Sequence, residues 1–517
     1  MSTLFLNNRT SRLSLALANL RWGDGAALIA GAALVLAFAP FGWWPLAVLA
    51  PACLFWLWRD CGRGRAAWRG WLFGLGYWGA GVHWIYFSLH HFGAAVAPLA
   101  ALLTALFAMG LALTLALLGF LVASGDPRKR SPAWFLLTLP GAWLLLEWFR
   151  SWFMTGFPWL LIGTSQLDAP LAPYAPVIGV YGVGLVLALT AGVIAGLPRL
   201  AMGARVVALV AVAVLWAGAP LVGERDWTQA AGEPFEAAVV QGNFSQSSKF
   251  ESLDEALARY SGLTRQLAGD VQLVLWPETA VPTFYREVAP RLSDFAEEMA
   301  GQGTQVVTGV FTHGGERTYY NAVRALGGEQ PNEYRKQRLV PFGEYLPLRS
   351  LLAPFERFIQ VPMSDIAAGS ADQAPLRVGD YRVGASVCYE AAYPGVIRDA
   401  VPEADVLANV SNDAWFGDST APPQHLEIAR MRALETGRPM LRATNTGISA
   451  IIGHRGDLIA RGPQFEAAVV RGDVTPREGL TPYARWGDLP IIGLAALLAL
   501  SSAGLARLGG GQKDLFR

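Results

Sequence analysis

Eight apolar segments constrain this chain more than any other feature, because an apolar run of sufficient length predicts a helix that spans a membrane. We predict such spans at about 24–40, 44–58, 69–89, 94–123, 133–152, 174–197, 203–221 and 489–506. Several are shorter than the ~20 residues that a simple span needs, so their ends are loosely defined. Hydrophobic residues make up 53% of the 517 residues and charged residues only 16%, a balance typical of membrane proteins.

A stretch of ordinary soluble composition, residues 225–485, separates the seventh apolar segment from the eighth and carries most of the acidic residues. We therefore predict three parts. Residues 1–224 form an N-terminal membrane domain of seven transmembrane helices, residues 225–485 form a globular domain, and residues 486–517 form a last transmembrane helix with a tail. The net charge of +1 provides no field that would attract nucleic acid, so no nucleic-acid partner is expected.

The positions of lysine and arginine predict the orientation. They precede the first span, lie in the loops after the second, fourth and sixth, and follow the eighth: Arg9, Arg12, Arg21, Arg59, Arg63, Arg65, Arg69, Arg128, Lys129, Arg130, Arg199, Arg205, Arg507, Lys513 and Arg517. Such loops face the cytoplasm, and Arg150 is the exception. Seven crossings then place 225–485 on the outer side. Residues 37–39 resemble a signal-peptide cleavage site, but the polar lead is long and more spans follow, which favours a retained first helix.

Strand and helix patterns alternate within 225–485, which predicts a layered α/β domain. The expected strands are 235–240, 271–276, 305–311, 319–326, 382–387, 405–410, 441–452 and 465–470, and the expected helices are 254–267, 286–299 and 424–436.

Cys388 ends one of these buried strands and is the only cysteine of the globular domain. Strand ends are where loops converge and reacting groups are displayed, although most free cysteines are small buried hydrophobes. Two further side chains favour a catalytic interpretation: Glu278 ends another strand, and Lys336 lies beside a turn. A thiol with a pKa of ~8.5 needs a base, for which Glu278 is the candidate. Lys336 and the backbone N–H of Tyr389 could stabilise an oxyanion, although Lys336 could also be a solvated surface lysine.

The remaining cysteines and the histidines indicate no further chemistry. Cys53, Cys61 and Cys388 are an odd number without tandem spacing, which excludes a disulfide framework and a cysteine zinc site. The histidines lack metal-ligand spacing, so we expect no metal ion and no cofactor. His425 stands at the start of a predicted helix, where we expect it to cap or pack.

The pattern of strand-end Glu, then Lys, then strand-end Cys-x-Glu resembles the nitrilase superfamily of carbon–nitrogen hydrolases. With the flanking spans, the chain resembles the membrane-embedded bacterial apolipoprotein N-acyltransferases over nearly its whole length. The motifs that carry this resemblance are 156–159 (GFPW), 240–243 (VQGN), 276–278 (WPE), 320–322 (YNA), 339–344 (LVPFGE), 387–390 (VCYE), 411–417 (SNDAWFG), 424–426 (QHL) and 445–447 (NTG). One departure is Phe250, which stands where the family often has tryptophan.

The resemblance implies a multi-span helical membrane domain with an α-β-β-α nitrilase-like domain. It implies that Cys388 takes an acyl chain from a phospholipid, typically the sn-1 chain of phosphatidylethanolamine, as a thioester. The amino group of an S-diacylglyceryl cysteine at a lipoprotein N-terminus then receives the chain, which is the last step of lipoprotein maturation. Glu278 would be the base and Lys336 the oxyanion donor. The supporting or substrate-binding residues would be Glu344, Glu390, Tyr389, Asn321, Phe250, Trp415 and Asn412.

The implied location is the bacterial inner membrane, with the catalytic domain in the periplasm, and a monomer is expected among membrane lipids. Two other functions remain open. A membrane-tethered nitrilase-like amidase would need the same three residues and differ only in its acceptor. A non-catalytic lipid-binding or transport protein could have kept the fold, but the intact set of Glu278, Lys336 and Cys388 argues against it.

Overall fold

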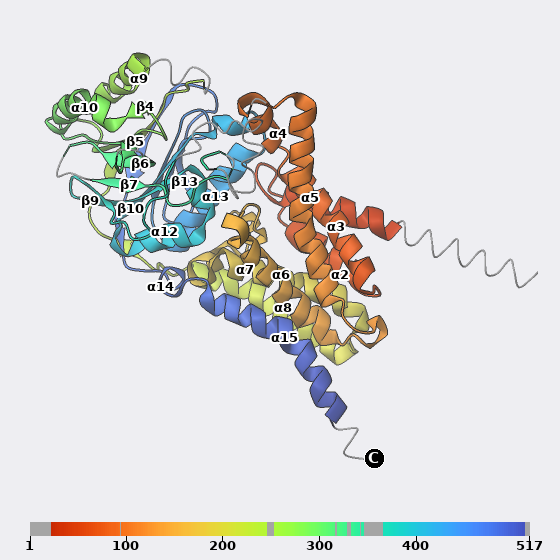
Figure 1. Ribbon diagram of the computed structural model, residues 1–517. Helices are drawn as coiled ribbons and strands as arrows, with labels where there is room; N and C mark the ends of the chain where they lie inside the picture. Colours follow the sequence, from red (N-terminus) through yellow and green to blue (C-terminus); the bar gives the residue numbers. More distant parts are fainter. Residues whose placement is uncertain are drawn as a thin grey trace, which may run out of the picture.

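The computed structural model describes residues 22–93, 95–245, 253–315, 318–327, 332–341, 343–345 and 366–511. Apolar helices gather in one part of the molecule and the sheets in the other (Figure 1). The main helices of the first part are Trp22–Ala37, α2 (Leu46–Trp58), α3 (Arg63–Gly81), α5 (Ala97–Val122), α6 (Leu139–Arg150), α7 (Ala175–Gly196) and α8 (Met202–Gly223). The C-terminal helix α15 (Leu489–Gly511) returns to pack beside α6 and α7.

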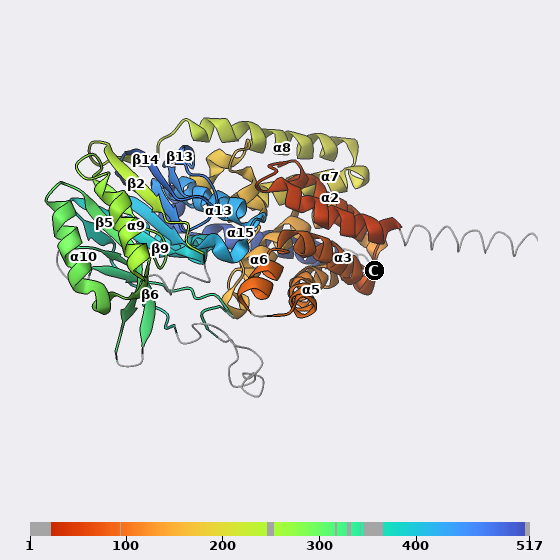
Figure 2. The same cartoon turned by 90° about the horizontal axis from the view of Figure 1, so that it is seen from above.

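Three of the described helical segments are long and apolar enough to cross a membrane: Ala97–Val122, Ala172–Arg199 and Met202–Gly223. The apolar segments Trp22–Ala37, Leu46–Trp58 and Leu489–Ser501 are shorter. Helix α8 runs along the outside of the bundle with most of its apolar side chains exposed, as expected of a helix that faces lipid (Figure 2).

Helix α3 begins earlier than predicted and ends at Gly81, so the predicted span 69–89 is misplaced. The early start is possible because Asp24 neutralises two arginines of the first turns, with Arg65 at 2.8 Å and Arg69 at 3.3 Å. Beyond Gly81 the chain continues as the short helix α4 (Ile85–Phe87) and the π-helical turn η2 (Ser88–Phe92).

Helix α7 is interrupted at Gly179, whose φ of 66° and ψ of 176° are not helical. A side chain there would strike the ring of Tyr483, since an added Cβ would lie 2.5 Å from a ring carbon. The interruption frees the N–H of Val180, which donates to the Glu435 carboxylate at 2.5 Å. Glu435 belongs to α13 (Ala421–Thr436), a helix of the α/β part, so the break in α7 becomes a junction between the two parts.

The α/β part contains two large sheets packed face to face and a small antiparallel pair of β1 (Gln229–Ala230) and β15 (Arg477–Glu478). One has the order β14-β2-β3-β5-β6-β7 with β4 paired to β5, and the other has the order β13-β12-β11-β10-β9-β8. Their strands are β2 (Phe235–Gln241), β3 (Leu273–Leu275), β4 (Val281–Phe284), β5 (Gln305–His313), β6 (Tyr319–Ala325), β7 (Glu333–Arg335), β8 (Leu376–Val378), β9 (Tyr381–Val387), β10 (Val406–Ser411), β11 (Met440–Thr444), β12 (Ala450–Ile452), β13 (Leu458–Arg461) and β14 (Ala468–Val474).

Helices cover both outer faces of this pair of sheets. Helices α9 (Leu253–Arg265) and α10 (Tyr285–Ala300) lie on the first sheet, while α12 (Pro394–Ala400) and α13 lie between the second sheet and the helical part (Figure 1). The predicted α-β-β-α sandwich is therefore confirmed. The pairs β2–β3 and β3–β5 run parallel in one sheet, as do β9–β10 and β10–β11 in the other.

Most predicted strands form within a few residues of the expected positions, but the single strand at 441–452 is wrong. Two antiparallel strands, β11 and β12, occupy this range. The Asn445-Thr446-Gly447 sequence between them is rich in residues that favour turns. The last predicted strand, 465–470, forms later, as β14, because Phe465 has a positive φ of 61°.

Candidate active site

Glu278 and Cys388 each follow the carboxyl end of a parallel strand, β3 in one sheet and β9 in the other. Both residues are buried, with 7% and 8% of their surface exposed. Lys336 follows β7 and is held by its own backbone, since its N–H donates to the Asn321 carbonyl at 2.8 Å. Only 1% of Lys336 is exposed, so it is not a solvated surface lysine.

The charged ends of these residues form a compact buried cluster. The Nζ of Lys336 donates to Glu344 Oε1 at 2.8 Å and lies 3.7 Å from Glu278 Oε1. Asn321 joins the two acids, because its Nδ2 donates to Glu278 at 2.7 Å and to Glu344 at 3.2 Å. Burial lowers the pKa of Lys336, but the two carboxylates outweigh it and hold the pKa above its ordinary value. The lysine therefore stays protonated.

Cys388 has a left-handed backbone, with a φ of 53°, and is the first residue of the 3₁₀ turn η10 (Cys388–Ala392). Such conformations are costly for residues other than glycine and concentrate at functional sites. Burial, and to a smaller extent the charge of Glu278, raise the pKa of the thiol to about 12, although Lys336 opposes the shift. The resting thiol is protonated and can react as a nucleophile only if a neighbouring base removes its proton.

Glu390 connects the segment after Lys336 to the strand before Cys388. Its Oε1 accepts from the backbone N–H groups of Gln337 at 2.6 Å and Arg338 at 3.0 Å. Its Oε2 accepts from the N–H of Val387 at 2.8 Å and from the Tyr334 hydroxyl at 3.0 Å. Burial raises the pKa of Glu390 above its ordinary value, although the backbone donors oppose this. One buried carboxyl group thus fixes the distance between the two reactive segments.

A group of aromatic side chains lies next to Cys388, and both parts of the molecule contribute to it. The ring of Tyr389 lies near those of Phe157 and Trp159, with centroids 6.2 and 6.3 Å away, and its hydroxyl donates to the Gly156 carbonyl at 3.4 Å. Arg150, at the end of α6, holds this loop by donating to the Trp159 carbonyl at 2.8 Å. The helical part therefore shapes the apolar side of the site.

Of the other predicted supporting residues, Asn412 and Trp415 contact further segments of the described chain, and one lies outside it. The Asn412 side-chain oxygen accepts from Asn445 Nδ2 at 3.3 Å. The Trp415 ring packs edge-on against Phe92, 5.0 Å between centroids, and its carbonyl accepts from the Ser88 hydroxyl at 2.6 Å. Trp415 thus joins the loop after β10 to the helical part. Phe250 lies outside the described residues.

His425 packs in the interior, as expected, but it also contacts the nucleophile's backbone, which was not predicted. Its Nε2 lies 3.1 Å from the Cys388 carbonyl oxygen, and its Nδ1 lies 2.9 Å from Asp413 Oδ1. The ring is fully buried. The only sequence signal was membership of the Gln-His-Leu and Ser-Asn-Asp motifs, since spacing alone does not relate these residues.

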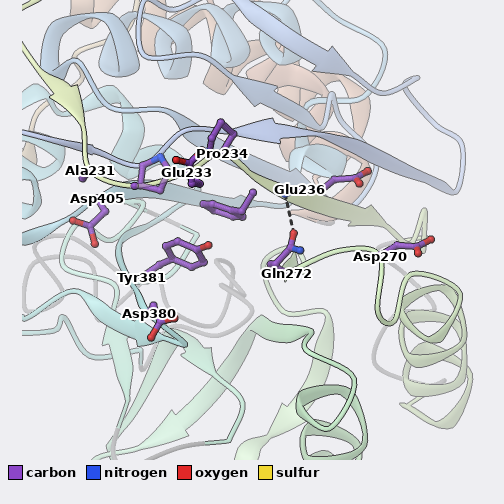
Figure 3. A pocket seen from close by; sticks show the side chains of 12 residues that line it. Ala231, Glu233, Pro234, Glu236, Asp270, Gln272, Asp380, Tyr381 and Asp405 are labelled. Carbon is purple, nitrogen blue, oxygen red and sulfur yellow. Dashed lines mark hydrogen bonds between the residues drawn. The ribbon is translucent and has the colours of Figure 1, made fainter.

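A cavity of about 500 Å³ lies at the opposite, amino-terminal ends of the strands (Figure 3). Phe235 and Tyr381 stack in it with centroids 4.1 Å apart. Its acidic lining residues are Glu233, Glu236, Asp270, Asp380 and Asp405. Glu278, Lys336 and Cys388 are not among the residues that line it, so this cavity is separate from the buried cluster.

A strand-end cysteine beside a buried lysine and glutamate, in an α-β-β-α sandwich, is the arrangement of a carbon–nitrogen hydrolase. Residues 236–483 match the family described as Carbon-nitrogen hydrolase. Residues 30–193 match the family described as Apolipoprotein N-acyltransferase N-terminal domain. The chain belongs to the apolipoprotein N-acyltransferase family and is a membrane-bound acyltransferase with a carbon–nitrogen hydrolase catalytic domain.

Relatives match along almost the whole chain. The apolipoprotein N-acyltransferase of Azotobacter vinelandii is 44% identical over 484 residues, which are 92% of this chain and 94% of the relative. That of Pseudomonas aeruginosa PAO1 is 42% identical over 490 residues, 92% of this chain and 95% of the relative. A solved carbon–nitrogen hydrolase from Helicobacter pylori G27 is 16% identical, covers 47% of this chain and 89% of its own, and has a TM-score of 0.35.

Proposed function

We propose that this acyltransferase moves an acyl chain from a phospholipid, typically the sn-1 chain of phosphatidylethanolamine, to the N-terminal S-diacylglyceryl cysteine of apolipoproteins. The relatives' name supports an apolipoprotein acceptor. The observation that carries the proposal is the buried set of a cysteine, a cationic lysine and a glutamate, with Lys336 Nζ 3.7 Å from Glu278. Acyl chains are costly to transfer into water, so an enzyme with apolar helices can meet both lipid substrates without extracting them.

In the first half-reaction, Glu278 accepts the proton of Cys388 while the sulfur attacks the ester carbonyl of the phospholipid. The negative charge on the tetrahedral oxygen is stabilised by Lys336 Nζ and the N–H of Tyr389. The ester C–O bond then breaks, and Glu278 returns the proton to the departing lysophospholipid oxygen. Cys388 is left as a thioester.

In the second half-reaction, the α-amino group of the diacylglyceryl cysteine attacks the thioester carbonyl. Glu278 accepts a proton from the amine, and the same two donors stabilise the second oxyanion. The C–S bond breaks, the sulfur regains its proton from Glu278, and the product is an N-acylated lipoprotein. Both steps use the same residues because both pass through a tetrahedral oxyanion.

The surrounding carboxylates have positioning roles in this proposal. Glu344 holds Lys336 through the 2.8 Å bond, so the ammonium group points at the reacting centre without needing to reorganise. Glu390 holds the segment after Lys336 against the end of β9, as described above. Asn321 bonds Glu278 at 2.7 Å and orients the base.

The proposal includes a topology. Residues 1–224 would form a seven-helix membrane domain, 225–485 the periplasmic catalytic domain, and 486–517 a last transmembrane helix with a cytoplasmic tail of an inner-membrane protein. The alternating positive loops support this orientation. A reporter enzyme fused after Arg225 should show periplasmic-type activity, and cytoplasmic-type activity there would overturn the topology.

The experiment that tests the chemistry is transfer of a radiolabelled acyl chain from phosphatidylethanolamine to a synthetic diacylated lipopeptide by the purified full-length protein in detergent. Labelled triacylated lipopeptide is the expected product. Release of free fatty acid, or hydrolysis of a small amide, without lipopeptide acylation would favour a hydrolytic amidase instead. Lipid binding without either product would indicate a non-catalytic protein.

A further inference from the structure

A buried polar network lies beneath the backbone of Cys388, and the chemistry proposed above does not use it. The Cys388 carbonyl oxygen faces two potential donors: His425 Nε2 at 3.1 Å and Asn409 Nδ2 at 3.4 Å. Both side chains are fully buried. A buried carbonyl needs only one partner to be satisfied, so two side chains directed at one oxygen indicate that its orientation matters.

Both side chains are supported by a single buried cation. Arg442 Nη2 donates to Asp413 Oδ2 at 2.9 Å, and Asp413 Oδ1 lies 2.9 Å from His425 Nδ1. The other arm is direct, since Arg442 Nη1 donates to the side-chain oxygen of Asn409. Arg442, Asp413, His425 and Asn409 come from β11, the turn after β10, α13 and β10, so four elements converge on one carbonyl.

The orientation of this carbonyl fixes the orientation of the next amide. A peptide group is planar and trans, so the C=O of Cys388 and the N–H of Tyr389 point in opposite directions within one plane. Holding the oxygen toward His425 therefore directs the N–H of Tyr389 away from His425. Cys388 also has a φ of 53°, an unusual conformation for a residue with a side chain, so hydrogen bonds to its carbonyl help to hold a strained segment of backbone in place.

We propose that His425 is a positioning residue for the oxyanion site: it holds the peptide between residues 388 and 389 so that the N–H of Tyr389 faces the developing oxyanion. The inference rests on the proposed function, because that N–H is one of its two oxyanion donors. His425 touches neither substrate nor the reacting atoms. It acts through the peptide of the nucleophile, while Lys336 supplies the other donor.

Hydrogen bonding explains why a histidine suits this position. Both ring nitrogens face acceptor oxygens, Nε2 the Cys388 carbonyl and Nδ1 the Asp413 carboxylate, so the ring donates to both when it carries a proton on each nitrogen. Glutamine places an amide nitrogen where Nε2 lies and can keep the bond to the carbonyl. Asparagine is shorter, places its amide where Nδ1 lies, and leaves the carbonyl without that donor.

The test compares two reactions of Cys388 in the purified full-length protein. Single-turnover acylation by labelled phosphatidylethanolamine passes through an oxyanion. Alkylation by iodoacetamide is a displacement at saturated carbon and forms no oxyanion, but it still requires a folded site with a competent thiol. The variants are His425→Gln, His425→Asn and His425→Leu, and His454→Leu is the matched control because His454 is a half-buried histidine of the same domain.

We expect His425→Leu and His425→Asn to slow acylation by up to ~10²-fold, at or below the ~10²–10³ that follows complete loss of an oxyanion donor. Both should be alkylated at close to the wild-type rate, His425→Gln should recover most of the acylation rate, and His454→Leu should behave as wild type. Equal losses in acylation and alkylation would overturn this positioning role, because His425 would then support the thiol itself and not only the N–H of Tyr389.

Equal acylation by the Gln and Asn variants would also overturn it, whether or not the Leu variant folds. Failure of the wild-type protein to be acylated, while iodoacetamide still modifies Cys388, would overturn the proposed function itself. If the wild-type protein is acylated normally and the His425 variants are acylated at the same rate, only the positioning role of His425 would be overturned. The two failures are therefore distinguishable.

Discussion

Both ends of the sheets carry ionisable groups, but the two sets differ in how far they are buried and in how they are bonded. At the carboxyl ends, Glu278, Lys336 and Glu344 are buried and bonded to one another. At the amino ends, Glu233, Asp270 and Asp380 of the 500 Å³ cavity are exposed, with 67% of the Asp270 side chain open to solvent, while Asp405 is buried and paired with Arg382. Removing charges from water is expensive, so the buried cluster persists only with mutual bonding, whereas exposed acids cost little.

This difference shows that the size of a cavity is a poor guide to chemistry in this protein. The open acidic cavity contains carboxylates but neither the thiol nor the lysine, whereas Glu278 and Lys336 both influence the pKa of Cys388. Perturbed ionisable groups that share partners are the better indicator of a reactive site. Substitutions at the two ends of the sheets should therefore have very different effects.

The largest effect is expected from Cys388→Ser, which should abolish acyl transfer in a folded protein. A hydroxyl is far harder to ionise than a thiol, so Glu278 alone could not activate it. Transfer from labelled phosphatidylethanolamine to lipopeptide is the measurement. Cys53→Ser, in helix α2 of the other part, is the matched control and should remain active. Near-normal transfer by folded Cys388→Ser would refute the nucleophile assignment.

Glu278→Gln should block formation of the thioester itself. Glutamine keeps the shape and one hydrogen-bonding oxygen but cannot accept the thiol proton, and general acid–base assistance is typically worth ~10²–10⁴ in rate. Single-turnover acylation by labelled phospholipid, without lipopeptide, measures this step. A variant that forms the thioester at the wild-type rate would show that another group accepts the proton.

Lys336→Met should slow both half-reactions, each by roughly 10²–10³, because each passes through an oxyanion that loses one donor. Lys336→Arg should not restore activity, since a planar guanidinium presents its donors in another geometry. Acylation followed by a lipopeptide chase separates the steps. If Lys336→Met acylates normally and fails only in the chase, the lysine serves the amine step and the oxyanion assignment is wrong.

The pH dependence of alkylation should distinguish Cys388 from an exposed thiol. Burial raises its pKa to about 12 by disfavouring the thiolate, so little thiolate accumulates at neutral pH and its fraction rises only as the pH nears that value. Iodoacetamide labelling followed from pH 7 to 10 should therefore lack a step at the ordinary thiol pKa of ~8.5. A step there would mean that the resting thiol is neither desolvated nor under the influence of Glu278.

The smallest effect is expected at the opposite end of the sheets. Asp380→Asn and Glu233→Gln remove exposed charges of the acidic cavity and should leave transfer unchanged. Such surface changes usually alter the free energy of unfolding by less than about 0.5 kcal/mol. Transfer rates and thermal unfolding check both statements. A large loss of activity would show that this cavity takes part in the reaction and would contradict the view that only the carboxyl ends of the strands carry the chemistry.

Local patterns predicted the parts of the site that depend on single strands. Apolar runs ending in a reactive side chain located Glu278 and Cys388, and the structure places both at strand ends. The α-β-β-α sandwich was predicted from the alternation of strand and helix patterns and from the resemblance to the nitrilase superfamily. The turn that splits 441–452 was missed although the polar Asn445-Thr446-Gly447 between the two strands carries a turn signal.

Contacts between distant segments could not be predicted from the pattern. His425, Asp413, Arg442 and Asn409 come from different elements: strand pairing brings Asn409 beside Arg442, and the packing of α13 on the second sheet adds His425. The capping of α7 by Glu435 depends likewise on how two separate parts dock. Polar residues spaced this way fit several folds, so their partners become visible only in three dimensions.

The account's central claim is that Cys388 carries the acyl chain, and a mass spectrum of the purified protein tests it most directly. After incubation with phosphatidylethanolamine alone, the wild-type protein should gain the mass of one acyl group on the peptide containing Cys388. The adduct should disappear when diacylated lipopeptide is added, and Cys388→Ser should never acquire it. Acylated lipopeptide formed without this adduct, or with the acyl group on another residue, would contradict the account.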